Sequence, residues 1–341
     1  MPYLMNCWYT AAFSEEISQA PICRTLLGQP LALFRTEEGS AVALHDRCPH
    51  RFAPLHKGKV IGEAIQCPYH GLRFDAKGAC VFNPSGDGKL PRAAQVVSYP
   101  LRELDGIIWI WFGDETPDES QIVRYEIFNQ PDRWTTIQDR LDVAASYALV
   151  ADNLLDLSHA EFVHPDLATP GFNKRVQLTV EQEGDEVIAN NWRPSEPITP
   201  GFRRQWGPDA PELVDHRSVV RWNPPATLWL DIGVTRVGAP ESEAIKSIAA
   251  HLVTPETENT CHYFWKSARN HHIGDEAFSH ASYAVIDKAF RMEDKPMIEA
   301  QQRLMEGRRF EELNPIPLGT DIAAMRARRV LNAKLAAQAS A

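Results

Sequence analysis

Two short segments of the chain each combine one cysteine with one histidine. The first is Cys48-Pro49-His50, and the second, Cys67-Pro68-Tyr69-His70, follows after sixteen residues. Two thiolates and two imidazoles can bind zinc, or a [2Fe–2S] cluster in which cysteines hold one iron and histidines the other. Zinc fingers pair like ligands within a segment, whereas here each segment supplies one ligand of each kind. The spacing therefore favours the cluster; a structural zinc site and two coincidental pairs are the alternatives.

The surrounding segment resembles the Rieske domain of ring-hydroxylating oxygenases. Pro49 and Pro68 stiffen the two loops, and Gly71 lets the backbone pass close to a cluster. Respiratory Rieske proteins carry an additional disulfide cysteine in each loop, where this chain has Ala53 and Tyr69, so the resemblance is to the soluble, low-potential type. The cluster ligands that it implies are Cys48, His50, Cys67 and His70.

A second pair of histidines, His159 and His164, lies five residues apart in a stretch expected to be helical over residues 146–164. On an ideal helix such positions diverge by about 140°, so they converge only if the helix ends or distorts between them. Pro165 follows directly, and Asp156 lies one turn before His159, where it can hydrogen-bond the imidazole. The alternative is a helix with two solvated or satisfied histidines.

The pattern Asn153-x-x-Asp156-x-x-His159-x4-His164 is similar to the mononuclear iron motif of Rieske oxygenases, which bind Fe(II) with two histidines and one carboxylate. The resemblance covers nearly the whole chain and is closest to the branch of vanillate O-demethylase, dicamba monooxygenase and toluenesulfonate methyl-monooxygenase. Further matching segments are Asn6-Cys7-Trp8-Tyr9, residues 48–55, Thr254-Pro255-Glu256-Thr257-Glu258 and Ala268-Arg269-Asn270.

The resemblance places the third iron ligand far downstream, and Asp294 fits its position. On the long helix expected from about Asp275 to Arg309, kinked at Pro296, this residue shares an apolar face with Phe290 and Ile298. A buried carboxylate needs a partner, which a metal ion provides. Glu293 is expected to turn about 100° away, and an exposed helix charge is the alternative for Asp294.

The same resemblance implies the activity of a terminal oxygenase component. A separate NAD(P)H-dependent flavin/iron–sulfur reductase or a ferredoxin would supply electrons to the cluster, which passes them to Fe(II) in the next subunit of a homotrimer. Asp156 would bridge the two centres by bonding His159 and His70 of a neighbouring subunit. Asn153 would lie near the iron without binding it.

The implied reaction uses O2 to oxidise an aromatic acid, foremost by O-demethylation of a methoxybenzoate-like aryl ether with release of formaldehyde. Hydroxylation of an aryl methyl group or ring, and N-dealkylation, remain open because the same iron motif serves all of them. A different class is a Rieske electron-transfer protein without oxygenase activity, which would need only the first 115 residues or so. A zinc-stabilised binding module is the remote alternative.

The substrate pocket is defined less sharply by the sequence. The resemblance places His251 on a strand beside the active site, where it could donate a hydrogen bond to a substrate carboxylate; a strand histidine satisfied within the protein is an equal alternative. Leu230 and Val285 stand where the dicamba enzyme has an amide and an indole, so dicamba itself is not expected as the substrate. Core packing is an equal alternative for the apolar candidates Ile286, Trp229, Phe202 and Tyr283.

Hairpin signals dominate the part of the chain that must position the cluster ligands. Short apolar runs flank turns such as Asp105-Gly106, and Ile107–Phe112 is apolar without interruption, as in a strand buried on both faces. Residues 113–133 are acidic and contain proline, which suits a linker. We expect a Rieske [2Fe–2S] domain at 1–115 and a catalytic mononuclear iron domain at 116–341. The resemblance implies an α+β fold: an all-β Rieske domain, then an antiparallel sheet flanked by helices (helix-grip type).

Composition limits the remaining classes. The chain has 341 residues, 44% of them hydrophobic, and a formal net charge of −10, which argues against a nucleic-acid partner. No apolar run approaches the roughly 20 residues needed to span a bilayer, and no export signal is recognisable, so we expect no membrane partner and a cytoplasmic location. The other four cysteines lack ligand spacing and are expected to be buried thiols: Cys7, Cys23, Cys80 and Cys261.

Overall fold

The computed structural model describes residues 3–340 and divides into two compact units. The N-terminal unit contains Met5–Arg124 together with Thr254–Glu258, and the C-terminal unit contains Tyr125–Val253, residues 259–340 and residues 3–4. Residues 254–258, the tip of a hairpin whose strands lie mostly in the C-terminal unit, therefore group with the N-terminal unit. Their backbone accepts bonds from Leu27 and Gly28.

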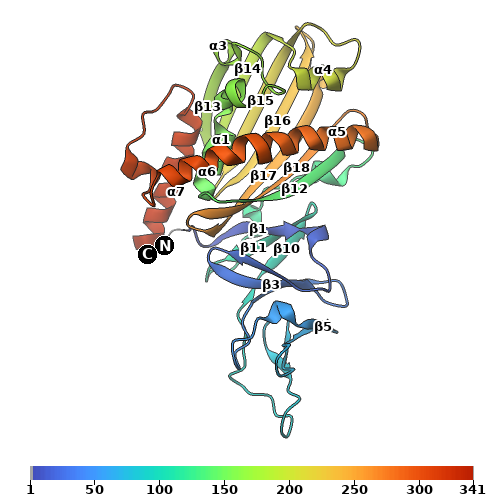
Figure 1. The fold of residues 1–341 in the computed structure, drawn as a ribbon, viewed down its shortest axis with the longest axis vertical. Helices are drawn as coiled ribbons and strands as arrows, with labels where there is room; N and C mark the ends of the chain where they lie inside the picture. Colours follow the sequence, from blue (N-terminus) through green and yellow to red (C-terminus); the bar gives the residue numbers. More distant parts are fainter. Residues whose placement is uncertain (1–2, 341) are drawn as a thin grey trace. The chain divides into compact units, whose positions relative to one another are not determined.

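The N-terminal unit is built from three small antiparallel sheets with strand orders β1-β11-β10, β2-β3-β4-β9 and β5-β6-β7-β8 (Figure 1). The first sheet contains β1 (Cys7–Phe13), β10 (Leu101–Leu104) and β11 (Ile107–Phe112). The second contains β2 (Ile22–Leu26), β3 (Gln29–Arg35), β4 (Ala41–His45) and β9 (Ser98–Tyr99). The third contains β5 (Lys59–Ile61), β6 (Ala64–Gln66), β7 (Arg73–Asp75) and β8 (Cys80–Phe82).

The hairpin signals of this unit correspond to real hairpins. β10 and β11 pair across Asp105 and Gly106, which both have positive φ, as the tight turn requires. Every residue of β11 is buried, as its uninterrupted apolar sequence predicts. A hydrophobic core that includes Phe34, Leu44 and Phe74 also contains Cys48 and Cys67, so packing of the second and third sheets fixes both cysteines.

The C-terminal unit contains one seven-stranded antiparallel sheet with the order β12-β18-β17-β16-β15-β14-β13 (Figure 1). This confirms the expected α+β fold class, with an antiparallel sheet in the C-terminal unit. The strands are β12 (Thr135–Val143), β13 (Gln177–Glu183), β14 (Glu186–Pro197), β15 (Leu213–Asn223), β16 (Thr227–Arg236), β17 (Ile245–Thr257) and β18 (Thr260–Arg269).

A long, nearly continuous helix crosses one face of this sheet (Figure 1). It consists of α5 (Glu276–Asp287), a π-helical segment at Lys288–Asp294, and α6 (Lys295–Leu304). We expected a kink at Pro296; the π-helical turns lie immediately before it, where a proline ring disrupts regular α-helical bonding. The remaining helices are α1 (Tyr147–Leu155), α2 (Ala160–Val163), α3 (Phe172–Arg175), α4 (Pro200–Trp206) and α7 (Ile322–Ser340).

The expected helix over residues 146–164 is wrong in one respect. It ends at Leu155, and Asp156 adopts an extended conformation (φ −107°, ψ 98°) before a 3-10 turn at Leu157–His159 and the short α2. Asp156 caps that turn, because its carboxylate accepts a bond from the Ser158 backbone N–H. The break separates both histidines from α1, and α2 ends at Val163, so His164 (φ −118°, ψ 82°) departs from the helical path.

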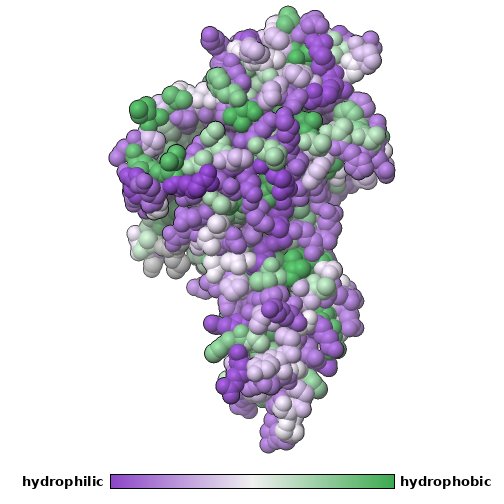
Figure 2. Space-filling model, in the orientation of Figure 1, coloured by the Kyte–Doolittle hydropathy of each residue, from purple (hydrophilic) through white to green (hydrophobic). Residues whose placement is uncertain are grey.

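The visible surface is mostly hydrophilic, with apolar residues in small separate patches (Figure 2). Within residues 3–340, no helix is both long enough and apolar enough to cross a membrane. Of the four unassigned cysteines, Cys7 and Cys261 are buried as expected. The expectation is wrong for Cys23, which is exposed on an edge strand, and for Cys80, which is half-buried.

Candidate metal centres and substrate cavity

The two cysteine–histidine loops of the N-terminal unit have the same backbone bonding. Cys48 N–H donates to Ala53 O (2.9 Å) and Phe52 N–H to Cys48 O (2.9 Å). In the second loop Cys67 N–H donates to the carbonyl of residue 72 (2.8 Å) and Gly71 N–H to Cys67 O (3.1 Å). Phe52 and Gly71 occupy equivalent positions with φ of 61° and 76°, so the same left-handed turn closes each loop. Local sequence therefore shapes both halves of the site alike.

The four loop residues lie together with thiols inward and imidazoles outward. Cys48 and Cys67 are 1% and 2% exposed, whereas His50 and His70 are exposed, with ring centroids 4.5 Å apart. Burial, and contact with the second thiol, raise the pKa of Cys48 to about 11, so this pocket disfavours a bare thiolate. Buried sulfurs and exposed imidazoles fit a [2Fe–2S] cluster with one iron inside and the other at the surface.

The three other predicted ligands meet in the C-terminal unit. His159 is the last residue of the 3-10 turn, His164 follows α2 directly, and Asp294 is the last residue of the π-helical segment. Asp294 Oδ1 lies 3.4 Å from His159 Nε2 and 3.2 Å from His164 Nε2. The short helix α2 ends at Val163, between the two histidines, as convergence requires, and the ligand atoms of all three residues lie within 4.8 Å of one another.

The far nitrogens of both imidazoles face acceptors. His159 Nδ1 lies 2.6 Å from the Asp156 carbonyl oxygen, and His164 Nδ1 lies 2.8 Å from Glu293 Oε2. Protons on these nitrogens leave the two neutral Nε2 atoms with lone pairs directed at the Asp294 carboxylate. Three acceptors facing one another require positive charge between them. The donor set fits a divalent iron ion with two histidines and one carboxylate.

The pKa values of His164 and Asp294 also indicate a site that favours positive charge. Burial lowers the pKa of His164, but the carboxylates of Asp294 and Glu293 outweigh burial and raise it above its ordinary value. Burial alone would raise the pKa of Asp294, yet hydrogen bonds to the two imidazoles hold it at about 2. Asp294, 6% exposed, is therefore an ionised buried carboxylate.

Glu293 is the site residue that sequence reasoning missed. An α-helix would turn it about 100° away from Asp294, but the π-helical segment has more residues in each turn. Its carboxylate consequently reaches His164, and Lys288 Nζ lies 2.9 Å from its other oxygen. The adjacent Glu-Asp pair just before Pro296 was the sequence feature that pointed to Glu293. That pair does not predict the π-helical geometry that brings Glu293 to His164.

Asp156 bonds His159 in a different way from the one expected. The main-chain carbonyl, not the carboxylate, contacts the imidazole. The carboxylate instead caps the following turn and binds Ser158, accepting from both the backbone N–H and the hydroxyl at 2.9 Å. Asn153 lies as expected beside the triad: its Nδ2 is 3.2 Å from Asp294 Oδ1 and 3.4 Å from His159 Nε2.

A cavity of about 190 Å³ opens onto the triad. Its wall is mainly apolar and includes the predicted residues Leu230, Ile286 and Phe202, with His251. Val285 lies outside this wall and lines an adjoining cavity. Trp229 and Tyr283 line neither: Trp229 stacks on Tyr125, with ring centroids 5.2 Å apart, and Tyr283 donates to Asp139.

His251 presents an unpaired nitrogen to this cavity. Its Nδ1 lies 2.7 Å from the Tyr263 hydroxyl, while Nε2 has no hydrogen-bond partner among the described residues. Burial lowers the pKa of His251 to about 4, so the ring is neutral. With the phenol donating to Nδ1, Nε2 carries the proton and can donate to a ligand.

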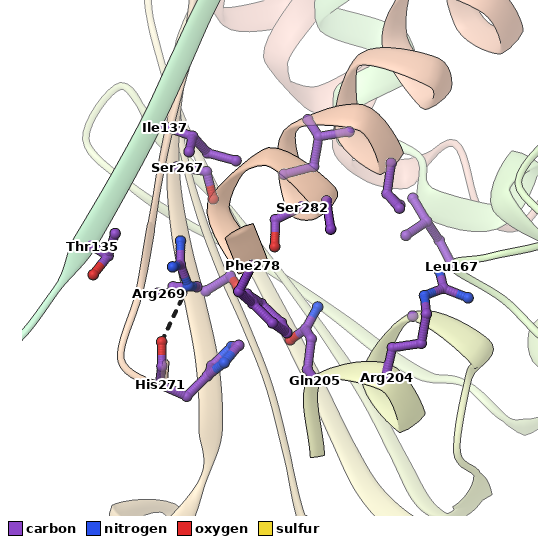
Figure 3. Close-up of a pocket in the computed structure, with 15 residues that line it drawn as sticks. Thr135, Ile137, Leu167, Arg204, Gln205, Ser267, Arg269, His271, Phe278 and Ser282 are labelled. Carbon is purple, nitrogen blue, oxygen red and sulfur yellow. Dashed lines mark hydrogen bonds between the residues drawn. The ribbon is translucent and has the colours of Figure 1, made fainter. Parts of the chain in front are cut away.

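The adjoining cavity, of about 120 Å³, shares Leu167, Ser267 and Ile286 with the first (Figure 3). Figure 3 shows Arg269 on one side of it and Gln205 and Arg204 on the other. Arg269 is 5% exposed, and its Nε and Nη2 donate to backbone carbonyls and to Ser279, but within residues 3–340 its Nη1 has no partner.

The charge of this second cavity is positive. Its described lining contains two guanidinium groups and no carboxylate. Arg204 pairs with Asp166 outside the lining (3.0 Å), whereas Arg269 bonds only neutral acceptors. A buried cation with an unused N–H group favours an anionic ligand.

Two family models together match most of the chain. The Rieske [2Fe–2S] domain matches residues 7–100, and the vanillate O-demethylase oxygenase C-terminal domain matches residues 143–337. The oxygenase component of chloroacetanilide N-alkylformylase from Rhizorhabdus wittichii is 38% identical over 98% of this chain and 97% of its own length. That of dicamba O-demethylase from Stenotrophomonas maltophilia is 37% identical over 96% and 97%.

Structural comparison gives the same result. The crystal structure of dicamba monooxygenase bound to 3,6-dichlorosalicylic acid superposes with a TM-score of 0.94 at 36% identity, covering 99% of both chains. A further structure of that enzyme, which contains non-haem iron and dicamba, superposes with a TM-score of 0.84 at 34% identity. The resemblance thus spans both units and both candidate metal centres.

Proposed function

The chain belongs to the Rieske non-haem iron oxygenases that carry the vanillate O-demethylase C-terminal domain, and from that premise we propose that it O-demethylates an aromatic acid. It is the oxygenase component of a monooxygenase system with a separate source of electrons, and its cofactors are a Rieske cluster and a mononuclear iron. The finer assignment, an aryl methyl ether that bears a carboxylate, rests on the two cavities.

We assign the cluster to Cys48, His50, Cys67 and His70, and the iron to His159, His164 and Asp294. When bound, the cluster delivers single electrons and the iron activates O2 for attack on a C–H bond. Oxidation of an O-methyl group gives a hemiacetal that breaks down to formaldehyde and a phenol; two electrons, two protons and one O2 complete the balance, with water as the other product.

The residues around the iron ligands hold their orientation. Glu293 and the Asp156 carbonyl fix the protonated nitrogens of the two imidazoles, so that both Nε2 atoms face Asp294, where they would hold the ion. Asn153 donates to Asp294 Oδ1 and keeps that carboxylate in place. The apolar wall around Phe290 and Ile286 excludes water from the methyl group to be oxidised.

The single observation that carries the acid assignment is the Nη1 atom of the buried Arg269, which has no hydrogen-bond partner among the described residues and lies in the cavity next to the iron cavity. The two cavities share Leu167, Ser267 and Ile286, so a methoxybenzoate with its methoxy group toward the triad would have its carboxylate directed toward the positively charged cavity. His251 Nε2–H then supplies a further donor along the substrate.

A matched pair of substrates tests this assignment: 3-methoxybenzoate and 3-methoxybenzamide, assayed for formaldehyde release and O2 uptake with a generic reductase. Ser282, which lines the Arg269 cavity, is changed to Asp, with Ser282→Asn as the uncharged control. We expect Ser282→Asp to raise KM for the benzoate about tenfold and to leave the benzamide unaffected. Absence of formaldehyde from every methoxybenzoate would refute the proposal.

A second candidate function is oxidative N-dealkylation of a neutral anilide. The cavity at the iron contains no lysine or arginine in its described lining, and Leu230 adds an apolar side chain there. A relative of similar identity is named an N-alkylformylase. Aldehyde release from N-alkyl anilides, together with none from methoxybenzoates, would favour this activity over O-demethylation.

We also propose that the chain works as a homotrimer in which electrons cross between subunits through Asp156. The half-buried position of its carboxylate, beside the turn that carries His159, supports this role. Asp156→Asn keeps the cap on Ser158 and should retain both metals while lowering turnover by about 100-fold. Iron content, the cluster EPR signal and turnover together measure it; normal turnover with full iron content would contradict the role.

A further inference from the structure

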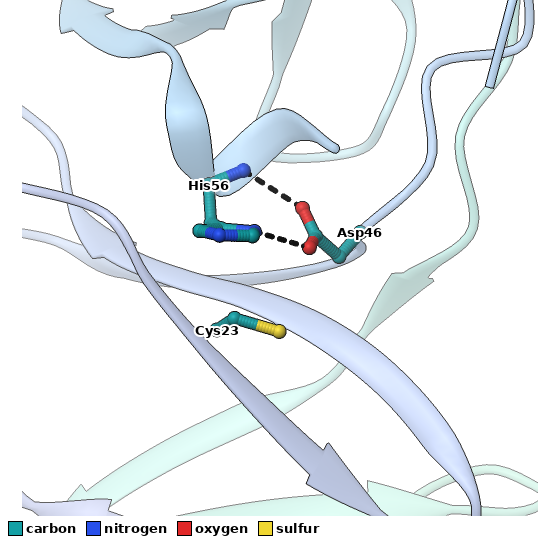
Figure 4. A group of neighbouring side chains, drawn as sticks. All are labelled: Cys23, Asp46 and His56. Atoms are coloured by element: carbon teal, nitrogen blue, oxygen red, sulfur yellow. Dashed lines mark hydrogen bonds and ion pairs between the residues drawn. The ribbon is translucent and has the colours of Figure 1, made fainter. Parts of the chain in front are cut away.

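We propose that Cys23, Asp46 and His56 form a binding site for a zinc-class divalent cation in the N-terminal unit, separate from both iron centres (Figure 4). One thiol sulfur, one carboxylate oxygen and one imidazole nitrogen lie within 4.8 Å of one another. The proposed oxygenase function does not use any of the three residues.

Three separate segments bring these side chains together. Cys23 projects from the edge strand β2, Asp46 follows β4, and His56 lies in a 3-10 turn at Leu55–Lys57. Figure 4 shows the sulfur beside the aspartate and the imidazole, on the side where the other two meet. The convergence is tertiary, because no sequence motif links the three positions.

Asp46 already fixes the orientation of His56. One carboxylate oxygen accepts from the His56 backbone N–H (2.7 Å), and the other lies 2.5 Å from Nδ1. Asp46 is 7% exposed, so this pair is held rigidly at the base of the site. To bind zinc at ligand distances of about 2.0–2.1 Å, the imidazole nitrogen and the carboxylate oxygen would have to move apart by less than about 1 Å from their present separation.

The donor set selects the kind of cation. Thiolate with imidazole favours zinc, cobalt and related ions over magnesium and calcium, which prefer oxygen ligands. Three protein ligands leave a fourth tetrahedral position for water, and the exposure of Cys23 provides the entry path. Burial of the thiol, and then the nearby Asp46 charge, raise the pKa of Cys23 to about 11, so binding displaces a proton from sulfur.

The location gives the site a structural consequence. Asp46 precedes Cys48, and His56 follows His50, so the two residues flank the loop that supplies half of the cluster ligands. A cation that joins them to Cys23 would tie both ends of that loop to the edge strand β2. We therefore expect it to stabilise the N-terminal unit without touching the mononuclear iron.

The test is titration of the iron-loaded holoenzyme with Co2+ and with Zn2+. We expect one equivalent of Co2+ to bind with a thiolate-to-cobalt charge-transfer band in the difference spectrum, and bound iron to stay constant. Cys23→Ser and His56→Ala should each weaken binding about tenfold or more, and Cys23→Ser should abolish the band. Cys80→Ser, a half-buried thiol of the same unit, is the matched control and should bind like the wild type.

Two results would overturn the proposal. One is a thiolate band that is absent, or that is equally strong in Cys23→Ser. The other is uptake of Co2+ or Zn2+ only in exchange for iron, because this places the added ion at the His159–His164–Asp294 triad. Zn2+ that raises the melting temperature of the wild type but not of Cys23→Ser, at constant iron content, supports it.

Discussion

The residues that we assign as ligands of the two metal centres differ in how far apart they lie along the chain. The cluster ligands come from one continuous stretch between Cys48 and His70, folded into two loops with the same backbone bonds. The triad joins His159 and His164 to Asp294, on a helix that packs over the sheet from a much later part of the sequence. The first centre is held by local turns and a small core, whereas the second exists only when the whole C-terminal unit is folded.

The two sets of residues also differ in their exposure to solvent. The cluster histidines face water, where an electron can be received, while Asp294 is buried at the end of a cavity that admits a ligand. A buried ionised carboxylate between two imidazoles depends on its cation far more than exposed imidazoles do. The comparison implies that the iron centre can be lost while the cluster persists.

The largest expected effect comes from Asp294→Asn. Removing the charge leaves the two Nε2 lone pairs without their anionic partner, so we expect loss of the iron and a fall in turnover of more than about 100-fold. The cluster EPR signal and visible spectrum should stay unchanged. Metal analysis measures the iron, and Asp287→Asn on the same helix is the control. Full iron retention would show that the triad is not the metal site.

Glu293→Gln should have the next largest effect. The amide can still accept from His164 Nδ1, but the negative charge that raises the pKa of that imidazole is gone. We expect iron affinity to fall about 10- to 100-fold, with cluster content unchanged. The rate of iron dissociation in the presence of a chelator measures this. An unchanged iron affinity would mean that Glu293 only forms an ion pair with Lys288 and does not support the iron site.

The smallest expected effect is on folding stability, which should fall more in the C-terminal unit than in the N-terminal unit as the pH is lowered. Burial lowers the pKa of His216 to about 3 and of His251 to about 4, both in the C-terminal unit. The unfolded chain takes up protons at these positions below about pH 6.5 while the folded unit does not, so stability falls as the pH falls. Each histidine should cost about 1 kcal/mol between pH 6.5 and 5.5.

Urea unfolding followed by tryptophan fluorescence at the two pH values measures this loss, and the visible spectrum of the cluster follows the N-terminal unit. The four histidines of that unit are exposed or half-buried, so we expect its loss to be smaller. His216→Gln should remove about 1 kcal/mol of the pH dependence. An unchanged pH dependence in that variant would mean that His216 does not remain neutral when folded.

Much of the N-terminal unit could be predicted because its signals are local. The hairpin at Asp105-Gly106 and the buried strand Ile107–Phe112 depend on neighbours in sequence, and the structure has both. The ligands of the cluster loops are likewise spaced by short turns. The helix break at Asp156 was not predicted, because the apolar spacing continues across it while the carboxylate caps the next turn.

The sequence by itself determined the ligand types: two thiols, four imidazoles and one downstream carboxylate, together with the family that uses them. Only the tertiary structure decided which groups act on those ligands. The π-helical segment brings Glu293 to His164, the broken helix presents the Asp156 carbonyl to His159, and the sheet places Arg269 beside the iron cavity. Each depends on backbone geometry and contacts between distant segments, which residue spacing along one strand or helix does not encode.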